Sequence, residues 1–245
     1  MNRIIFEIEG NACVAKDIFR MELRSEEFPG MRCGQFVDIA LDGRFLRRPI
    51  SVCHSEKGRL VLLYKLAGAG TRQMSDMAPG RKLDILTDLG NGFSLSACSR
   101  EALLIGGGIG TAPLLQLGED LVREGKKISV VLGFNTADEI VLTSEFEALG
   151  AEVRIATMDG SAGVKGFVTD ALKAFSPAYD HYYVCGPLPM EKAVFAALDS
   201  RGEYSLEERM GCGTGICYGC SLMTRSGAKR VCKDGPVFKK EELTW

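Results

Sequence analysis

Apolar residues in the first hundred positions fall into short runs of strand length. Runs that carry β-branched or apolar residues cover residues 4–8, 35–41, 59–66 and 82–86. Pro-Gly, Asp-Gly and Lys-Gly pairs separate these runs, and a short helix is expected to begin at Thr71 and to run through Met77. Several short strands at close spacing are typical of a β-barrel or sandwich, so residues 1–98 are predicted to form such a domain.

The pattern changes near residue 99, where short apolar runs begin to alternate with helical stretches. Strands are expected at residues 102–105, 128–132, 152–157 and 182–185, and helices at 113–124, 144–149, 168–175 and 189–200. This alternation predicts an α/β domain over residues 99–202, with a parallel sheet and crossover helices. From residue 203 the chain is rich in glycine, cysteine and turns, which indicates a third, small module over residues 203–245.

Composition narrows the classes of protein and of partner. Apolar residues make up 46% of the chain and charged residues 25%, which is the balance of a globular protein. The formal net charge of −2 leaves no basic footprint, so we expect no nucleic-acid partner. The N-terminus lacks a signal-peptide pattern, and the longest apolar region, residues 102–117, is broken by glycines and Pro113. We therefore expect a cytoplasmic protein with no membrane partner.

The cysteines are the strongest chemical signal in the sequence. Four of the nine lie within 21 residues, in the spacing C-x4-C-x2-C-x11-C, and they are Cys212, Cys217, Cys220 and Cys232. This spacing is typical of the ligands of a plant-type [2Fe–2S] cluster. Glycines between the cysteines would allow the loop to wrap tightly around such a group. A structural zinc site is the alternative, although zinc ribbons favour two separate C-x2-C pairs.

A glycine loop marks a candidate phosphate site in the α/β domain. Residues 106–113 read Gly-Gly-Gly-Ile-Gly-Thr-Ala-Pro and run from an expected strand into an expected helix. Glycines let the backbone approach a diphosphate, and a helix N-terminus offers free N–H groups. Pro113 stands where the dinucleotide fingerprint has its last glycine, and no acid follows the second strand directly. A tight strand–helix turn without a ligand is the alternative.

Two segments of the first domain suit a flavin. Arg47 and Arg48 are adjacent at a strand edge, just before Pro49, Ile50 and Ser51. Paired guanidinium groups match the oxygens of a diphosphate. A second glycine turn, Gly68-Ala69-Gly70-Thr71, opens the expected helix shortly after Tyr64 and Lys65. Taken singly, each segment could equally be a set of solvated charges or a tight turn.

Together these motifs and their order resemble the ferredoxin–NADP reductase superfamily. Within it the chain is most similar to the electron-transfer subunits of NAD-dependent (type B) dihydroorotate dehydrogenases, over essentially its whole length. The resemblance is carried by Arg48-Pro49-Ile50-Ser51, Gly70-Thr71, the loop 106–113, Cys185-Gly186-Pro187, and the cysteine set ending in Cys232-Lys233-Asp234-Gly235-Pro236-Val237-Phe238. It implies an antiparallel FAD-binding barrel over residues 1–98, an NAD-binding domain over 99–202 and a [2Fe–2S] module over 203–245.

The resemblance also implies roles for residues at the flavin. Arg48 would contact the FAD diphosphate, and Ser51 would lie at the reactive edge of the isoalloxazine as a catalytic residue. The superfamily usually has an aromatic residue where Ile50 stands, so apolar contact is expected here in place of ring stacking. The other residues expected to bind FAD are Pro49, Leu63, Tyr64, Lys65, Gly70 and Thr71.

A second set of residues is expected at the nicotinamide dinucleotide. These are Gly106, Gly107, Gly108, Gly110, Thr111, Pro113, Gly186 and Pro187. Cys185 ends the fourth strand of the α/β domain, at the edge where ligands of such sheets bind, and is a candidate catalytic residue. Its alternative is a buried strand cysteine. Residues 133–139 offer acids and no arginine, which favours NAD over NADP because a 2′-phosphate needs a cation.

The activity implied by the resemblance is electron transfer in de novo pyrimidine (UMP) biosynthesis. An FMN-containing catalytic subunit would oxidise dihydroorotate and pass electrons through the [2Fe–2S] cluster and FAD of this chain to NAD+. Two copies of each subunit would form a heterotetramer. Ile216 and Tyr218, between the cluster ligands, would belong to the docking face.

Two alternatives remain from the sequence. The chain could be a diaphorase subunit of a related NAD(P)H:ferredoxin, hydrogenase or sulfite reductase complex, because these subunits share the architecture. It could also be a zinc-stabilised adaptor without redox cofactors.

Overall fold

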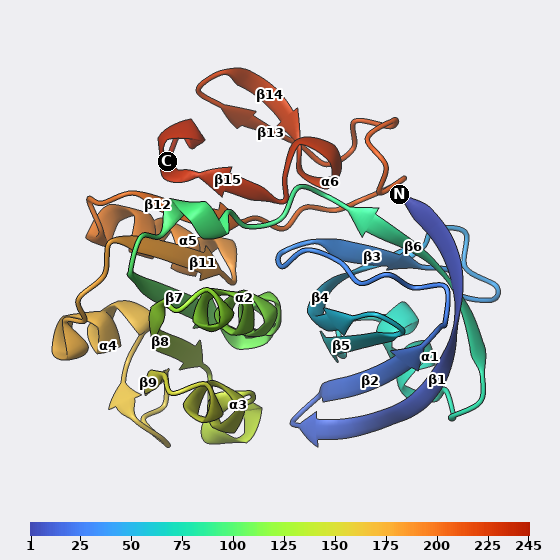
Figure 1. Ribbon diagram of the computed structural model, residues 1–245, viewed down its shortest axis with the longest axis horizontal. Helices are drawn as coiled ribbons and strands as arrows, with labels where there is room; N and C mark the ends of the chain where they lie inside the picture. The colour runs from blue at the N-terminus through green and yellow to red at the C-terminus, as the bar shows by residue number, and fades with distance from the viewer.

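The computed structural model describes all residues 1–245 and places a barrel beside an α/β domain, with the C-terminal segment along one end of both (Figure 1). The closed barrel has the strand order β1-β2-β5-β4-β3-β6 and is antiparallel throughout. Its elements are β1 (Asn2–Ala15), β2 (Ile18–Arg24), β3 (Phe36–Ile39), β4 (Arg48–Glu56), β5 (Arg59–Lys65), α1 (Ala69–Ser75) and β6 (Lys82–Leu89).

Alternation of apolar and polar residues fixes which face of each barrel strand is buried. In β1, Ile4, Phe6 and Ile8 point into the barrel core while their neighbours are exposed. Side chains alternate across a strand, so one residue in two reaches the core. The four expected barrel strands are confirmed, and β2 and β4 are additional. Their runs contain charged residues, and β4 begins with Arg48 and Pro49, which hides them from a search for apolar runs.

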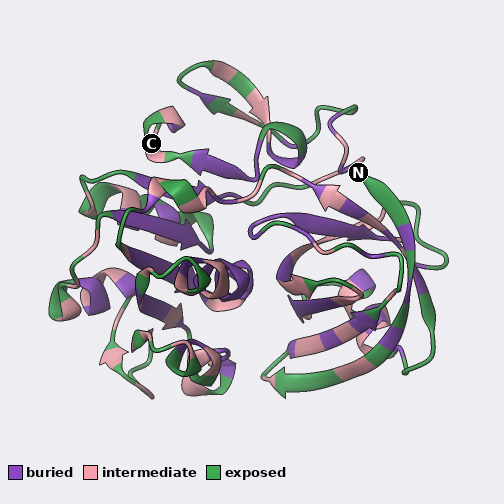
Figure 2. Ribbon diagram, viewed as in Figure 1, coloured by how far each residue is buried: buried purple, intermediate pink, exposed green.

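The second sheet is parallel except at one edge and has the strand order β10-β9-β8-β7-β11-β12-β15. Its elements are β7 (Glu101–Gly107), α2 (Ala112–Arg123), β8 (Lys127–Phe134), α3 (Thr143–Ala148), β9 (Glu152–Thr157), β10 (Val164–Lys165), α4 (Val168–Phe175), β11 (His181–Cys185), α5 (Leu188–Ala197), β12 (Gly202–Ser205) and β15 (Val237–Lys239). Leu114 of α2 and Phe146 of α3 share one core cluster, whereas Ala171 of α4 and Val194 of α5 share another. The helices therefore cover both faces of the sheet, and Figure 2 shows its central strands buried.

The C-terminal segment leaves this sheet after β12 and returns to it as β15. Between them lie the hairpin β13 (Ser221–Thr224) and β14 (Gly227–Arg230) and the short helix α6 (Val231–Asp234). Short 3-10 turns also occur, namely η1 (Leu95–Ala97), η2 (Gly108–Thr111), η3 (Ala137–Glu139) and η4 (Lys240–Glu242). The sequence pattern did not predict β12 or β15, because four and three residues are too few to show a period. No helix has the length and apolar character needed to cross a membrane.

A polar pair joins the barrel to helix α2. His54 Nδ1 of β4 lies 2.6 Å from Glu119 Oε2 of α2, and both side chains are partly buried. The hydrogen bond with Glu119 raises the pKa of His54 above its usual value. The stability that this pair contributes is therefore fully present below the pKa of an unfolded histidine, and is lost as the pH rises through the raised pKa.

We expect Glu119→Gln to lower the free energy of unfolding by about 1 kcal/mol at a pH near 6, and by much less at a pH near 9. Urea denaturation of both proteins at the two pH values measures the difference. A Glu119→Gln effect of the same size at both pH values would contradict a charged His54–Glu119 pair.

Candidate functional site

Two cavities meet where the barrel faces the α/β domain. The barrel cavity, about 320 Å³ in volume, lies against β4 and β5, and the sheet-edge cavity, about 600 Å³, lies along the carboxyl ends of the parallel strands. Four residues line both, and they are Lys65, Ile109, Gly110 and Glu207. A group bound in one cavity would therefore adjoin a group bound in the other.

Seven of the nine residues predicted at the flavin line the barrel cavity, and they are Pro49, Ile50, Ser51, Leu63, Tyr64, Lys65 and Thr71. Arg48 and Gly70 lie beside it, with the Arg48 side chain packed over Gly70. A Cβ on Gly70 would come within 2.1 Å of Arg48 Nε, so a larger residue would displace the guanidinium. The barrel thus brings the predicted flavin residues to one place.

Two of these side chains, Tyr64 and Thr71, make hydrogen bonds within the barrel domain itself. The hydroxyl of Tyr64 donates to Asn11 Oδ1 at 2.9 Å, its ring stacks on Phe19, and burial raises its pKa to about 12. The hydroxyl oxygen of Thr71 accepts hydrogen bonds from the backbone N–H groups of Ala67 and Gly68. Tyr64 therefore supports the wall of the cavity from the barrel core, and Thr71 stabilises the turn before α1.

The glycine loop lies at the centre of the sheet-edge cavity, where Gly107, Gly108 and Gly110 line it. Close packing requires glycine at three positions of this loop. A Cβ added to Gly106 would lie 2.8 Å from Thr111 Oγ1, and one added to Gly110 would lie 2.6 Å from the Cys185 carbonyl oxygen. A Cβ added to Gly107 would collide with Met190 Sδ. Gly108 differs, since it has a φ of +52° and open space around its Cα. Thr111 and Pro113 are buried behind the loop and do not line the cavity.

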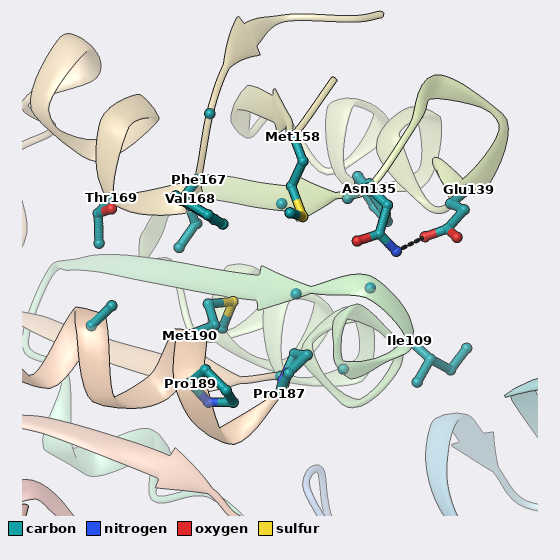
Figure 3. A pocket seen from close by; sticks show the side chains of 18 of the residues that line it. Ile109, Asn135, Glu139, Met158, Phe167, Val168, Thr169, Pro187, Pro189 and Met190 are labelled. Atoms are coloured by element: carbon teal, nitrogen blue, oxygen red, sulfur yellow. Dashed lines mark hydrogen bonds between the residues drawn. The ribbon is translucent and has the colours of Figure 1, made fainter. Parts of the chain in front are cut away.

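The segment after β11 packs against the glycine loop and lines the same cavity. Gly186 and Pro187 line it as predicted, together with Met190 of α5 (Figure 3). Cys185 lines neither cavity, the residue is 2% exposed, and its burial in the core raises the pKa of its thiol. This geometry agrees with the alternative interpretation of Cys185 as a buried strand cysteine. A catalytic role for Cys185 stays a prediction.

Several lining residues were not identified from the sequence. Asn135 follows β8, Met158 follows β9 and Phe167 follows β10, and Figure 3 shows the three side chains near one another. Their positions just after parallel strands could have identified them as candidate binding residues, because ligands bind at the carboxyl edge of such sheets. Met158 and Phe167 are 51% and 61% exposed, although both are large and apolar.

Two buried or enclosed acids lie near the junction of the cavities. Burial raises the pKa of Glu191 to about 9, and the Oε1 atom of this α5 residue has no hydrogen-bond partner. Glu207 is reached by solvent through the cavities that it lines, yet the surrounding protein raises its pKa as well. Neither acid was singled out by the sequence, since no motif marks them.

The cysteine loop, residues 211–220, turns several backbone N–H groups toward sulfur. Cys212 Sγ accepts from Thr214, Ile216 and Cys217 at 3.3–3.4 Å. Cys217 Sγ accepts from the N–H of Gly219, and Cys220 Sγ from that of Cys232. Such donors stabilise thiolates and so fit an iron–sulfur cluster.

No group of three or more His, Cys, Asp or Glu side chains lies close enough to hold a single metal ion. The assignment of the four cysteines as ligands therefore stays a prediction.

The cysteine loop borders the barrel cavity. Met210, just before the loop, and Pro236, just after α6, both line that cavity. Within the loop, Gly213 packs against the carboxyl group of Asp38, and a Cβ on this glycine would come within 2.6 Å of Asp38 Oδ2. Asp38 pairs with Pro49 across β3 and β4, so the loop packs on the strands that carry the predicted flavin residues.

Comparison with known families identifies two parts of the chain. Residues 207–244 match the iron-sulfur cluster binding domain of dihydroorotate dehydrogenase B, and residues 104–195 match the oxidoreductase NAD-binding domain. The predicted iron–sulfur and NAD-binding modules are thus confirmed.

Solved structures confirm the predicted fold class. The structure of the NADH-dependent reduced ferredoxin-NADP oxidoreductase, described for flavin-based electron bifurcation, has a TM-score of 0.88, is 31% identical, and aligns over 98% of this chain and 90% of that chain. The cytochrome P450 reductase GcoB of Amycolatopsis shares the fold with a TM-score of 0.72 and 21% identity, over 80% of this chain and 65% of that chain. A barrel followed by a parallel-sheet domain is common to this group.

Curated relatives are similar over nearly their whole length. The dihydroorotate dehydrogenase B (NAD(+)) electron transfer subunit of Fusobacterium nucleatum is 40% identical and covers 96% of both chains. That of Geobacillus sp. is 42% identical and covers 94% of both. These identities favour this family over the related diaphorase subunits that the sequence left as an alternative. This chain belongs to the family of electron transfer subunits of dihydroorotate dehydrogenase B (NAD(+)).

Proposed function

We propose that this chain conducts electrons from an FMN-containing, dihydroorotate-oxidising subunit to NAD+. In this proposal Cys212, Cys217, Cys220 and Cys232 hold a [2Fe–2S] cluster, the barrel cavity holds the isoalloxazine of FAD, and the sheet-edge cavity holds the nicotinamide dinucleotide. The observation that carries the proposal is the order of the three sites. The cysteine loop borders the barrel cavity, which in turn shares four lining residues with the sheet-edge cavity.

The barrel residues would position the flavin. Pro49, Ile50 and Leu63 supply apolar contact in the barrel cavity, and Ser51 offers a hydroxyl there. The Arg48 guanidinium, packed over Gly70, lies at the start of α1, where it would meet the diphosphate. FAD, when bound, supplies the conversion between single electrons and a hydride, so the protein has to orient the group and exclude water.

The sheet-edge residues would position the dinucleotide against that flavin. Gly108 leaves open space in the wall of the cavity, where a diphosphate could approach the backbone. Gly186 and Pro187 adjoin the residues that line both cavities and would border the nicotinamide. The dinucleotide would therefore lie along the edge of the sheet, with its reactive ring toward the barrel.

The partner would dock on the outer side of the cysteine loop. Ile216 and Tyr218 are 81% and 65% exposed there, and Arg230 lies 4.8 Å over the ring of Tyr218. Exposed apolar side chains around a redox group suit a protein interface. We infer two copies of each subunit, and pyrimidine biosynthesis in the cytoplasm as the setting, where nine free cysteines would stay reduced.

Co-expression of this chain with the dihydroorotate-oxidising subunit of the same cell tests the proposal. We expect the purified complex to contain FMN, FAD and [2Fe–2S], and to reduce NAD+ when dihydroorotate is added. The control is the catalytic subunit alone, which should oxidise dihydroorotate only with another acceptor. A complex that contains zinc and no flavin in this chain would refute the proposal, as would a cluster found far from the subunit interface.

A further inference from the structure

Lys65 occupies a special place between the two cavities. It lies at the end of β5 in the barrel, and it is the single cationic side chain among the residues that line either cavity. Its ammonium group would therefore adjoin both the flavin and the dinucleotide of the proposed function. A charge in such a partly enclosed site acts more strongly than the same charge on the surface, because less water screens it.

The Lys65 ammonium is held by a carboxylate of the other domain. Lys65 Nζ lies 3.0 Å from Glu139 Oε1, and Glu139 Oε2 accepts a hydrogen bond from Asn135 Nδ2 at 2.8 Å (Figure 3). The Glu139 side chain is 10% exposed. Burial works against its ionisation, but the hydrogen bonds from Lys65 and Asn135 bring its pKa below the usual range. The junction thus contains an ion pair that joins β5 to the segment after β8.

We propose that Glu139 is a positioning residue that fixes the Lys65 ammonium at the junction of the cavities and cancels most of its charge there. This inference rests on the proposed function, in which the barrel cavity holds FAD. Two-electron reduction of FAD takes up two electrons and one proton, so the reduced group gains one negative charge. An uncompensated ammonium group beside it would favour the reduced form, and the paired carboxylate limits that effect. The pair would keep the flavin a strong enough reductant to give a hydride to NAD+.

The neighbouring acid provides a matched control. Asp138 is in the same 3-10 turn as Glu139 and carries the same charge, but it is exposed and lines neither cavity. Its backbone carbonyl accepts a hydrogen bond from the N–H of Lys16, a contact that a side-chain substitution leaves in place. Solvent and salt screen such an exposed charge, so its removal should leave the flavin unchanged.

The test is the reduction potential of FAD in the purified holoprotein, measured by spectroscopic titration against a reference dye. Glu139→Gln preserves the shape of the side chain and leaves the ammonium uncompensated, so we expect the ratio of reduced to oxidised FAD to rise about tenfold at a fixed potential, equal to about 30 mV for two electrons. Lys65→Met removes the cation and should lower that ratio by a similar factor. Asp138→Asn should leave it unchanged.

Opposite shifts in Glu139→Gln and Lys65→Met would support the proposal, because a purely structural role would move both variants in the same direction. Equal-sign shifts, no shift, or release of FAD from either variant would overturn it. The proposed function has its own readout, the dihydroorotate-dependent reduction of NAD+ by the wild-type complex. If that activity is normal while the potentials do not move, only the role of Glu139 is wrong. A wild-type chain that binds no FAD would defeat both.

Discussion

Replacing Cys217 by serine is expected to abolish dihydroorotate-dependent reduction of NAD+, lowering the rate by roughly 100-fold or more. Cys217 lies in the exposed part of the cysteine loop, where its sulfur accepts the N–H of Gly219 and packs near Gly211. The hydroxyl of serine is a much weaker ligand for iron than a thiolate, so the cluster would be destabilised and electrons from the partner would reach FAD far more slowly. Absorbance of NADH in the reconstituted complex measures the loss.

Two controls distinguish loss of the cluster from general damage to the protein: a second activity of the same variant, and a serine variant of a different cysteine. Oxidation of NADH by an artificial dye needs only the two cavities, so Cys217→Ser should retain it together with its bound FAD. Cys13→Ser is the matched control, because Cys13 is also exposed but lies on β1, far along the chain from the cysteine loop. Equal losses in the two serine variants, or loss of dye reduction in Cys217→Ser, would contradict a specific role in the cluster.

Replacing Gly110 by alanine is expected to lower the free energy of unfolding by about 3 kcal/mol and to weaken NADH binding by more than about tenfold. The added methyl group would lie 2.6 Å from the carbonyl oxygen of Cys185 and from the Cα of Gly186. Both atoms belong to the backbone, which cannot move aside as a flexible side chain could. The loop and the end of β11 would have to separate, and this would distort the wall of the sheet-edge cavity.

Gly108→Ala is the control variant in the same loop, because its added methyl group would strain the backbone without colliding with another atom. Gly108 has a φ of +52° but nothing within 4 Å of an added Cβ, so this variant should lose only about 1 kcal/mol. Urea denaturation gives the two stabilities, and fluorescence titration gives the two dissociation constants for NADH. A Gly110→Ala protein as stable as Gly108→Ala would show that the packing argument is wrong.

Local patterns in the sequence predicted a large part of the fold. The runs from residue 102 onward identified four strands of the parallel sheet, because the buried strands of such a sheet are largely apolar. The spacing of the cysteines identified the iron–sulfur module, because ligand spacing is a local property. Strands β12 and β15 were missed because their pairing depends on residues far away, such as the contact of Tyr204 with Phe238.

The junction between the cavities could not be predicted for the same reason. Lys65 and Glu139 are 74 positions apart and belong to different domains, so no motif links them. The burial of Cys185 could not be predicted either, and its catalytic role stays a prediction. Its place at the end of a strand suggested access to the ligand, but β11 is buried along its whole length and the thiol packs into the core. Position along an element does not determine which way a side chain points.

The central claim is that electrons from dihydroorotate reach NAD+ only through this chain. It is tested most directly by adding dihydroorotate anaerobically to the complex, while NADH absorbance and the EPR signal of the reduced cluster are recorded. We expect NADH from the wild-type complex and, when NAD+ is left out, an EPR signal of the reduced cluster, whereas the Cys217→Ser complex should show neither. NADH formed at the same rate by the catalytic subunit alone would contradict it.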